Sequence, residues 1–271
     1  MSWNLSTCQV DQVGMHDLGV QSCHYLSSSN ILITGSWDTK LRFWDLRSAQ
    51  PVFEKSLSGK IAAMDSLNNF ILAITRKSSL NDINPARNFV FDIRNMNTPF
   101  LTSDSKLKKQ VRCAALFSFG FISGCIAGRV AVDAVNNNTA TGIGLQQNSF
   151  RSYTFKCHRY TPPNNTACHV YSVNCLARHP TYETLATGGS DGKVSFWDCK
   201  SQNCLKHFKK LDDPPTLPIV AADFNLSGEL FAYAKSYDWS KGYNNYDYSS
   251  PTAIYVHAVK PTSVQCVSSR K

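Results

Sequence analysis

Residues 34–45 read T-G-S-W-D-T-K-L-R-F-W-D, and residues 187–198 read T-G-G-S-D-G-K-V-S-F-W-D. In each stretch a Gly-containing strand end leads to an Asp turn, and an alternating strand then closes on Trp-Asp. Trp44 follows Asp38 by six residues, and Trp197 follows Asp191 by the same interval. Two matched copies this far apart predict a repeat architecture, in which each copy belongs to one structural unit.

A strand that closes on Trp-Asp is typical of a WD-repeat β-propeller blade. Four blade-closing strands can be aligned, and they end at Asp45, Asp92, Asp133 and Asp198. The first two intervals, 47 and 41 residues, agree with the repeat period of roughly 40–45 residues. The third interval, 65 residues, requires an insertion, which the Asn- and Pro-rich stretches 136–149 and 160–169 supply as long loops. The stretch 240–251 is also expected to be a loop.

Short strands are predicted along the whole chain, and no window of 12 or more residues carries a helical stripe. The predicted strands are rich in Val, Ile, Phe and Tyr and are bounded by turn residues. They are 31–34, 41–44, 70–75, 89–92, 119–123, 130–135, 170–177, 184–187, 194–197, 219–224, 230–234 and 254–259. We therefore expect an all-β WD-repeat propeller.

The chain is expected to form a single domain of about five blades plus one extra strand. The expected blades are 16–50, 51–100, 101–150, 151–210 and 211–262, with 1–15 as the closing strand of a preceding blade and 263–271 as a tail. Such a set does not close a ring, and unpaired strand edges favour aggregation. Because Met1 almost adjoins the blade-closing Trp3, we expect an N-terminally truncated product; irregular closure or a covering partner are the alternatives.

Composition indicates an ordinary globular protein. Of 271 residues, 42% are hydrophobic and 17% charged, which argues against disorder. The 28 basic and 19 acidic residues give a net charge of +9, which favours an acidic partner such as nucleic acid, an acidic peptide or a membrane surface. Scattered surface lysines are the alternative explanation. The ten cysteines show no C-x-x-C pairing, and neither a signal peptide nor a membrane-inserting segment is predicted, so we expect an intracellular protein with reduced thiols.

Two sets of polar residues fit the hydrogen-bonded chain of WD-repeat blades. That chain joins a His before the first strand, a Ser or Thr on the second, an Asp in the next turn and a Trp on the third. One set is His16, Thr34, Asp38 and Trp44, and the other is His158, Thr187, Asp191 and Trp197. Because buried polar groups must be paired, these networks are expected to be structural.

Catalytic patterns are weak. The run from Gly188 to Gly192 matches G-x-S-x-G, but that motif needs a following helix, and the next residues predict a strand. A second group resembles a zinc site only in its ligand types, because its spacing matches no common zinc-finger pattern; it contains Cys157, His158, Cys168, His169 and Cys175. We expect no enzyme activity, no cofactor and no metal.

Several longer motifs resemble the mRNA-export WD-repeat factors of the nuclear pore, the RAE/GLE family. They are Ala127-Gly-Arg-Val-Ala-Val132, Phe155-Lys-Cys-His-Arg159, Ala186-Thr-Gly-Gly-Ser-Asp-Gly192 and Phe231-Ala-Tyr-Ala-Lys-Ser-Tyr-Asp-Trp-Ser-Lys-Gly242. The resemblance runs from about residue 16 to 259. The related BUB-type spindle-checkpoint proteins share the first three motifs but typically lack the last part of the fourth, which favours mRNA export. That family motif comprises Tyr237, Asp238, Trp239, Lys241 and Gly242.

The resemblance implies a seven-bladed propeller, from which this chain lacks the first blade and most of the second. It also implies a non-enzymatic adaptor in the nucleus, at the nuclear pore and envelope, with some protein in the cytoplasm. The implied partners are a GLEBS-type segment of a Phe-Gly-rich nucleoporin and single-stranded RNA or mRNA, both bound on one basic face. Carried over by motif, that face contains Arg129, Phe155, Lys156, Trp197 and Asp198.

Two departures from the family pattern stand out. Gln202 and Cys204 occupy positions where basic side chains are expected, which would weaken the binding face. The stretch from Thr75 to Arg87 is longer than the family's turn. Two alternative functions stay open: a spindle-checkpoint kinetochore adaptor with mitotic checkpoint proteins as partners, and a ubiquitin-ligase substrate receptor or scaffold.

Overall fold

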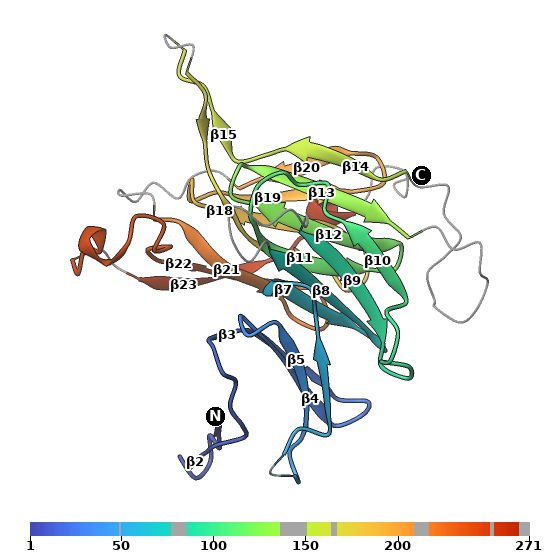
Figure 1. Ribbon diagram of the computed structural model, residues 1–271. Coiled ribbons are helices and arrows are strands. Elements are labelled where there is room, and N and C mark those ends of the chain that lie inside the picture. The colour runs from blue at the N-terminus through green and yellow to red at the C-terminus, as the bar shows by residue number, and fades with distance from the viewer. Residues whose placement is uncertain are drawn as a thin grey trace. The chain divides into compact units, whose positions relative to one another are not determined.

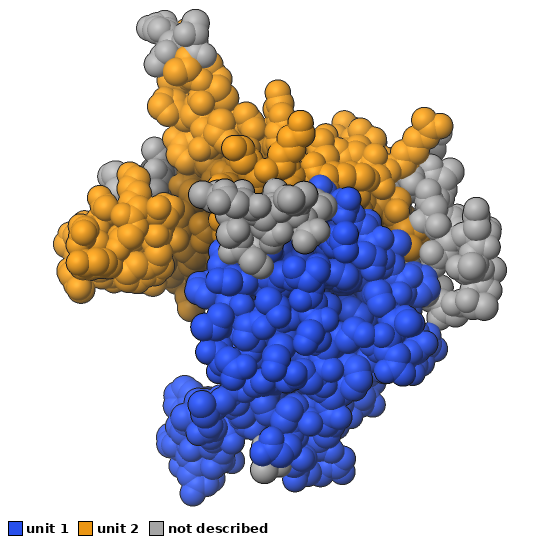
Figure 2. Space-filling model, in the orientation of Figure 1, with its two compact units in different colours: residues 1–105 blue, residues 106–271 orange. Residues whose placement is uncertain are grey.

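The protein, seen in a computed structural model, is built almost entirely of antiparallel β-sheets (Figure 1). The structure describes residues 1–48, 50–76, 86–135, 151–163, 167–208, 217–249 and 252–265. The chain forms two compact units, residues 1–105 and 106–271, coloured separately in Figure 2. Among the described residues, no helix is long and apolar enough to cross a membrane.

Unit 1 contains two four-stranded sheets and one short hairpin. The hairpin pairs β1 (Ser2–Trp3) with β2 (Val10–Asp11). The first sheet has the order β3 (Val20–Leu26), β4 (Ile31–Ser36), β5 (Lys40–Asp45), β6 (Phe53–Ser56). The second has the order β7 (Lys60–Leu67), β8 (Phe70–Arg76), β9 (Arg87–Asp92), β10 (Leu101–Asp104). One apolar cluster joins the two sheets, with Ile33 and Leu41 from the first and Ile71 and Phe91 from the second.

Unit 2 contains three further sheets and a hairpin. The third sheet is β11 (Val111–Phe117), β12 (Gly120–Cys125), β13 (Arg129–Ala134), β14 (Tyr153–Lys156). The hairpin of β15 (Arg159–Tyr160) and β16 (His169–Val170) precedes the fourth sheet, which is β17 (Val173–Arg178), β18 (Leu185–Gly189), β19 (Val194–Asp198), β20 (Asn203–His207). The fifth sheet has three strands, β21 (Ile219–Phe224), β22 (Leu230–Lys235) and β23 (Ala253–Ala258). The described part of the unit also contains two short helices, η1 (Tyr243–Asn245) and α1 (Pro261–Val264).

Burial follows the strand's place in its sheet, as propeller blades require. The second strands β12 and β18 are buried at every position. The fourth strands β6, β10 and β14 instead alternate between half-buried and exposed residues. In each unit the sheets therefore pack against one another as blades, and the fourth strand of a sheet forms its partly exposed edge. The predicted all-β WD-repeat propeller fold is confirmed.

Glycine allows adjacent blades to approach closely. A Cβ on Gly124 of β12 would lie 2.8 Å from Val173 of the next sheet. A Cβ on Gly188 of β18 would lie 2.6 Å from Ile219 of the sheet after that. Real side chains essentially never come this close, so the Thr-Gly and Ser-Gly pairs of the repeats are packing features.

The structure corrects the expected blade limits. Strands β6, β10 and β14 pair with the Trp-Asp or equivalent strands before them, so the boundaries at 50, 100 and 150 separate each sheet from its fourth strand. These outer strands are short and half exposed, and they carry no motif that would have placed them. Within the described residues Ser2–Trp3 pairs with Val10–Asp11 as a separate hairpin, and the expectation that 1–15 closes a preceding blade stays a prediction.

Other expectations on strands and loops have mixed outcomes. The predicted strand 170–177 is two strands, β16 and β17, and the expected loop 160–169 begins and ends within the β15–β16 hairpin. The expected loop 240–251 contains η1. The loop 136–149, most of the long stretch 75–87 and residues 266–271 of the expected tail lie outside the described residues.

Candidate functional site

The first predicted polar network is present in unit 1. His16 Nδ1 lies 2.8 Å from Asp38 Oδ2, and His16 Nε2 lies 2.7 Å from Thr34 Oγ1. Trp44 Nε1 donates to the same Thr34 oxygen at 2.8 Å. Burial of the Asp38 carboxylate acts to raise its pKa, but hydrogen bonds from His16 and from two backbone amides outweigh burial, so the pKa of Asp38 is lowered. The network holds the turn, the second strand and the third strand of its sheet together.

The second network repeats this geometry in unit 2. His158 Nδ1 lies 2.8 Å from Asp191 Oδ1, and its Nε2 lies 3.0 Å from Thr187 Oγ1. Trp197 Nε1 donates to Thr187 Oγ1 at 3.0 Å. One difference matters for function: Trp44 is buried, with 4% of its surface exposed, whereas Trp197 is only half buried. The exposed part of Trp197 lines a pocket.

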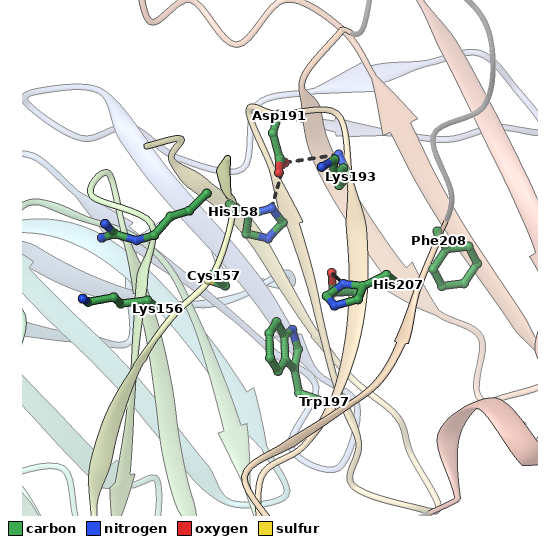
Figure 3. A pocket seen from close by; sticks show the side chains of 10 residues that line it. Lys156, Cys157, His158, Asp191, Lys193, Trp197, His207 and Phe208 are labelled. Atoms are coloured by element: carbon green, nitrogen blue, oxygen red, sulfur yellow. Dashed lines mark hydrogen bonds and ion pairs between the residues drawn. The ribbon is translucent and has the colours of Figure 1, made fainter. Parts of the chain in front are cut away.

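That pocket is an open hollow of about 810 Å³ in unit 2 (Figure 3). One wall is the segment that follows β14, and the opposite side is formed by the β18–β19 turn, β19 and the end of β20. Its lining residues are Lys156, Cys157, His158, Arg159, Asp191, Lys193, Ser195, Trp197, His207 and Phe208. The polar network thus forms part of the pocket, because three of its four members are lining residues.

Positive charge surrounds the opening. Lys156 and Lys193 are exposed, and the half-buried Arg159 guanidinium is held by the carbonyl oxygen of Ala127, to which Nη2 donates at 2.8 Å. Asp191 is the one acidic side chain among the lining residues, and it already accepts hydrogen bonds from His158 and the Lys193 amide. The pocket therefore favours an anionic ligand.

The floor of the pocket is aromatic. The ring centroids of Phe155 and Trp197 lie 4.8 Å apart, and the His207 ring stands edge-on to Trp197 at 5.9 Å. His207 Nδ1 lies 2.8 Å from Ser195 Oγ, which fixes the orientation of the imidazole. Figure 3 shows the Trp197 and His207 side chains side by side in the pocket. A flat ring or an apolar side chain could stack here while its charged part meets the cations of the rim.

The five residues expected on the binding face have different roles. Lys156 and Trp197 line the pocket, and Phe155 packs against Trp197. Arg129 is exposed and lies directly opposite Lys156 in the β13–β14 ladder, so their side chains share one face of the sheet. Asp198 is the exception: only 2% exposed, it accepts hydrogen bonds from the Lys200 and Ser201 amides and the Ser201 hydroxyl. Its carboxylate stabilises the turn after β19 and is not a pocket residue.

Several lining residues were not predicted. His207 and Phe208 come from the end of β20, a strand with too few apolar residues to be recognised in the sequence. Lys193 follows the Ala186–Gly192 motif, and Arg159 is the last residue of the Phe155–Arg159 motif, although neither was assigned to the binding face. Their position in or next to a recognised motif was the feature of the sequence that could have predicted them as lining residues.

The first departure from the family pattern, at Gln202 and Cys204, lies in the β19–β20 turn and in β20. Gln202 is exposed in the β19–β20 turn with a positive φ of 61°. Cys204 lies opposite Trp197 in the β19–β20 ladder, donates to the Phe196 carbonyl oxygen at 3.4 Å, and has a pKa raised by burial. Neither supplies charge, so the rim's positive charge comes from Lys156, Arg159 and Lys193.

The residues considered for catalysis or zinc binding have structural surroundings. Residues 188–192 lead from β18 into β19, a strand rather than a helix. Burial raises the pKa of both Cys157 and Cys175 to about 12, which keeps these thiols protonated. In the described parts of the chain, no three His, Cys, Asp or Glu side chains are grouped as metal ligands.

The family motif forms the start of the β22–β23 loop. Asp238 is buried and accepts hydrogen bonds from the Ser190 hydroxyl and, at 3.1 Å, from the Ser240 amide. Tyr237 donates its hydroxyl to the Gly242 carbonyl oxygen at 2.9 Å and accepts from the Lys241 amide at 3.2 Å. Trp239 remains exposed. The motif is therefore held to the β18–β19 turn, two residues of which line the pocket.

Known proteins resemble both the repeats and the whole chain. The model of the WD domain, G-beta repeat, matches residues 8–45 and 160–198. The chain is 34% identical over 268 residues to the Poly(A)+ RNA export protein of Schizosaccharomyces pombe, which covers 97% of this chain and 70% of that protein. It is 33% identical to Protein Rae1 of Drosophila melanogaster (94% and 70% covered) and 36% identical to the mRNA export factor of Xenopus tropicalis (94% and 66% covered).

One solved structure, described as the structure of U3-55K, resembles the fold. It superimposes with a TM-score of 0.72 at 15% identity and covers 95% of this chain and 73% of that one. At this identity the likeness concerns the propeller fold alone.

Proposed function

Because the chain belongs to the RAE/GLE family of WD-repeat mRNA-export factors, we propose that it is a non-enzymatic adaptor for mRNA export at the nuclear pore. In this proposal it binds single-stranded RNA and a GLEBS-type segment of a Phe-Gly-rich nucleoporin. Its location would be the nucleus, at the pore and envelope, with a cytoplasmic share.

One observation carries the proposal: the pocket of unit 2 combines a cationic rim with an aromatic floor. RNA presents a phosphate for each base, and proteins that hold single strands pair a basic groove with rings on which bases stack. Lys156, Arg159 and Lys193 supply the charge, and Trp197 with His207 supplies the rings. An acidic peptide with one apolar side chain has the same two requirements, so the nucleoporin segment is proposed for this face as well.

RNA binding is tested by its dependence on salt. Anisotropy of a labelled single strand, titrated at several salt concentrations, gives the slope of log affinity against log salt. Lys156→Gln removes one phosphate contact and should reduce that slope by about 0.7, with weaker binding at low salt. Lys108→Gln, an exposed lysine outside the pocket, is the matched control and should leave the slope unchanged. An unchanged slope for Lys156→Gln would remove the pocket from RNA binding.

Peptide binding separates the adaptor functions. Calorimetric titration with a GLEBS-type nucleoporin peptide should show saturable binding, and the peptide should raise the melting temperature of the chain. Binding of a kinetochore GLEBS peptide with no binding of the nucleoporin peptide would favour a spindle-checkpoint adaptor. Binding of neither peptide, together with no RNA binding, would leave a WD-repeat scaffold such as a ubiquitin-ligase substrate receptor.

A further inference from the structure

The loop between β22 and β23, at the end of the fifth sheet in Figure 1, exposes an unusual number of aromatic rings. Trp239 is 58% exposed, Tyr243 is 78% exposed and Tyr248 is 91% exposed. Soluble proteins seldom leave several large rings together in water unless the surface binds something.

The rings are ordered as a stack. Trp239 and Tyr246 lie parallel, with an interplanar angle of 5° and centroids 5.2 Å apart. Tyr248 stands edge-on to Tyr246 at 4.8 Å, and Tyr237 contacts Trp239 at 5.5 Å. Tyr246 covers one face of Trp239, and the exposure of Trp239 leaves its remaining surface open to a further flat ring. We call these four residues the aromatic platform.

Hydrogen bonds fix the backbone beneath the platform. Besides the contacts of Tyr237 with Gly242 and Lys241, Asn245 Nδ2 donates to the Lys241 carbonyl oxygen at 2.7 Å. Trp239 itself has a positive φ of 58°, a conformation that bulky residues rarely adopt. Backbone of this kind persists where the surroundings hold it, and it clusters at ligand-binding positions.

The platform is connected to the pocket through one turn. Asp238, next to Trp239, accepts the hydroxyl hydrogen bond of Ser190 at the start of the β18–β19 turn. In that same turn Asp191 and Lys193 line the pocket. Lys193 and, on the platform loop, Lys241 are both exposed. The two loops that this hydrogen bond joins, one at the pocket and one at the platform, therefore each carry an exposed lysine.

We propose that the aromatic platform is a second nucleic-acid contact, on which bases of the single strand stack after that strand leaves the pocket. This inference rests on the proposed RNA binding in the pocket and extends it to a separate site. A nucleic acid fits better than an apolar peptide, because the open surface is a flat parallel stack accompanied by lysines, and the chain carries a net charge of +9.

The test compares strand lengths. An RNA of about four nucleotides fills one site of this kind, whereas about twelve nucleotides can reach both. Trp239→Ala should weaken binding of the longer RNA roughly 5- to 150-fold and leave the shorter one unchanged, because one stacked base is lost. Trp239→Phe retains a ring and should restore most of the affinity. Trp3→Ala, which removes a tryptophan that is 63% exposed in unit 1, is the matched control and should change neither.

The outcomes separate the two proposals. Lys156→Gln should weaken both RNAs, because both use the pocket. If Trp239→Ala binds the longer RNA as tightly as the wild-type chain while Lys156→Gln does not, the platform proposal is wrong and the pocket proposal stands. If the wild-type chain binds neither RNA, both fall.

If the Trp239→Ala protein does not fold, a measurement on the wild-type chain tests the proposal instead. Photo-crosslinking with a twelve-nucleotide RNA that carries 4-thiouridine, followed by peptide mapping, should label the segment 237–248. Labels confined to segments outside 237–248 would overturn the proposal.

Discussion

Replacing the central threonine of each polar network by valine tests the different roles of the two networks. Thr34 and Thr187 each bond a histidine Nε2 and a tryptophan Nε1 through one hydroxyl oxygen. Valine has nearly the same shape, so the substitution deletes the oxygen without creating a cavity. Both sites are largely buried, with 9% of Thr34 and 0% of Thr187 exposed. The substitution therefore leaves one histidine nitrogen and one tryptophan nitrogen without their partner.

The expected cost follows from this geometry. A buried polar group without a partner lowers the free energy of unfolding by about 1–3 kcal/mol. The buried methyl group of valine offsets about 0.8 kcal/mol of this loss. For Thr34→Val both orphaned groups are enclosed, because Trp44 is only 4% exposed, and we expect a loss of about 2–4 kcal/mol. For Thr187→Val the half-buried Trp197 can turn toward water in the pocket, so we expect a smaller loss of about 1–2 kcal/mol.

Urea denaturation and RNA titration together provide the assay. Thr154→Val, on the exposed side of β14, is the matched control and should change stability by less than about 0.5 kcal/mol. Thr187→Val frees the ring that forms the pocket floor and should weaken RNA binding, whereas Thr34→Val should not. A Thr187→Val variant that loses more stability than Thr34→Val, or that binds RNA as tightly as the wild-type chain, would contradict these different roles of the two networks.

Three further predictions concern packing, pH and thiol reactivity. Gly188→Ala places a Cβ 2.6 Å from a side chain of the next sheet and should cost about 1–3 kcal/mol in urea denaturation; Gly19→Ala, with its nearest atom at 3.7 Å, should cost far less, and equal losses would contradict the packing argument. The lowered pKa of Asp38 means that its stabilisation is present above the ordinary value of 3.8 and is lost as pH falls through the lower folded value; in urea denaturation Asp38→Asn should thus lose less stability than the wild-type chain as pH falls below 3.8, and parallel stability curves would argue against it. Because burial raises the pKa of Cys157 to about 12, iodoacetamide at pH 8 should label the exposed Cys168 and spare Cys157, as mass spectrometry would show; equal labelling would mean that the native pocket wall opens.

The sequence predicted the second and third strands of the blades well, but it missed the first strands of three sheets, Val20–Leu26, Lys60–Leu67 and Val111–Phe117. The strands Ile31–Ser36 and Lys40–Asp45 carry apolar alternation and end in turn residues or Trp-Asp, and both polar networks follow from residue type and spacing. The outer strands escaped recognition, because strands such as Phe53–Ser56 and Asn203–His207 are short and half exposed, so hydrophobic burial leaves little pattern in them. Their pairing partners are set by the tertiary structure.

The pocket was only partly predictable for a related reason. Lys156 and Trp197 belong to recognisable motifs, whereas His207 joins them only because β20 pairs with β19. Asp198 was expected on the binding face, but a Trp-Asp dipeptide does not reveal that its carboxylate accepts hydrogen bonds from the following turn. Side-chain direction within a turn depends on backbone geometry that spacing alone does not encode.

Amide hydrogen exchange of the chain with and without a twelve-nucleotide single-stranded RNA tests the central claim most directly, because it maps where the ligand binds. We expect slower exchange in residues 156–159, in the β18–β19 turn at 190–193 and in β20 at 203–207, with residues 20–104 unchanged. Protection confined to unit 1, or no protection at saturating RNA, would contradict the assignment of the pocket as the RNA-binding site.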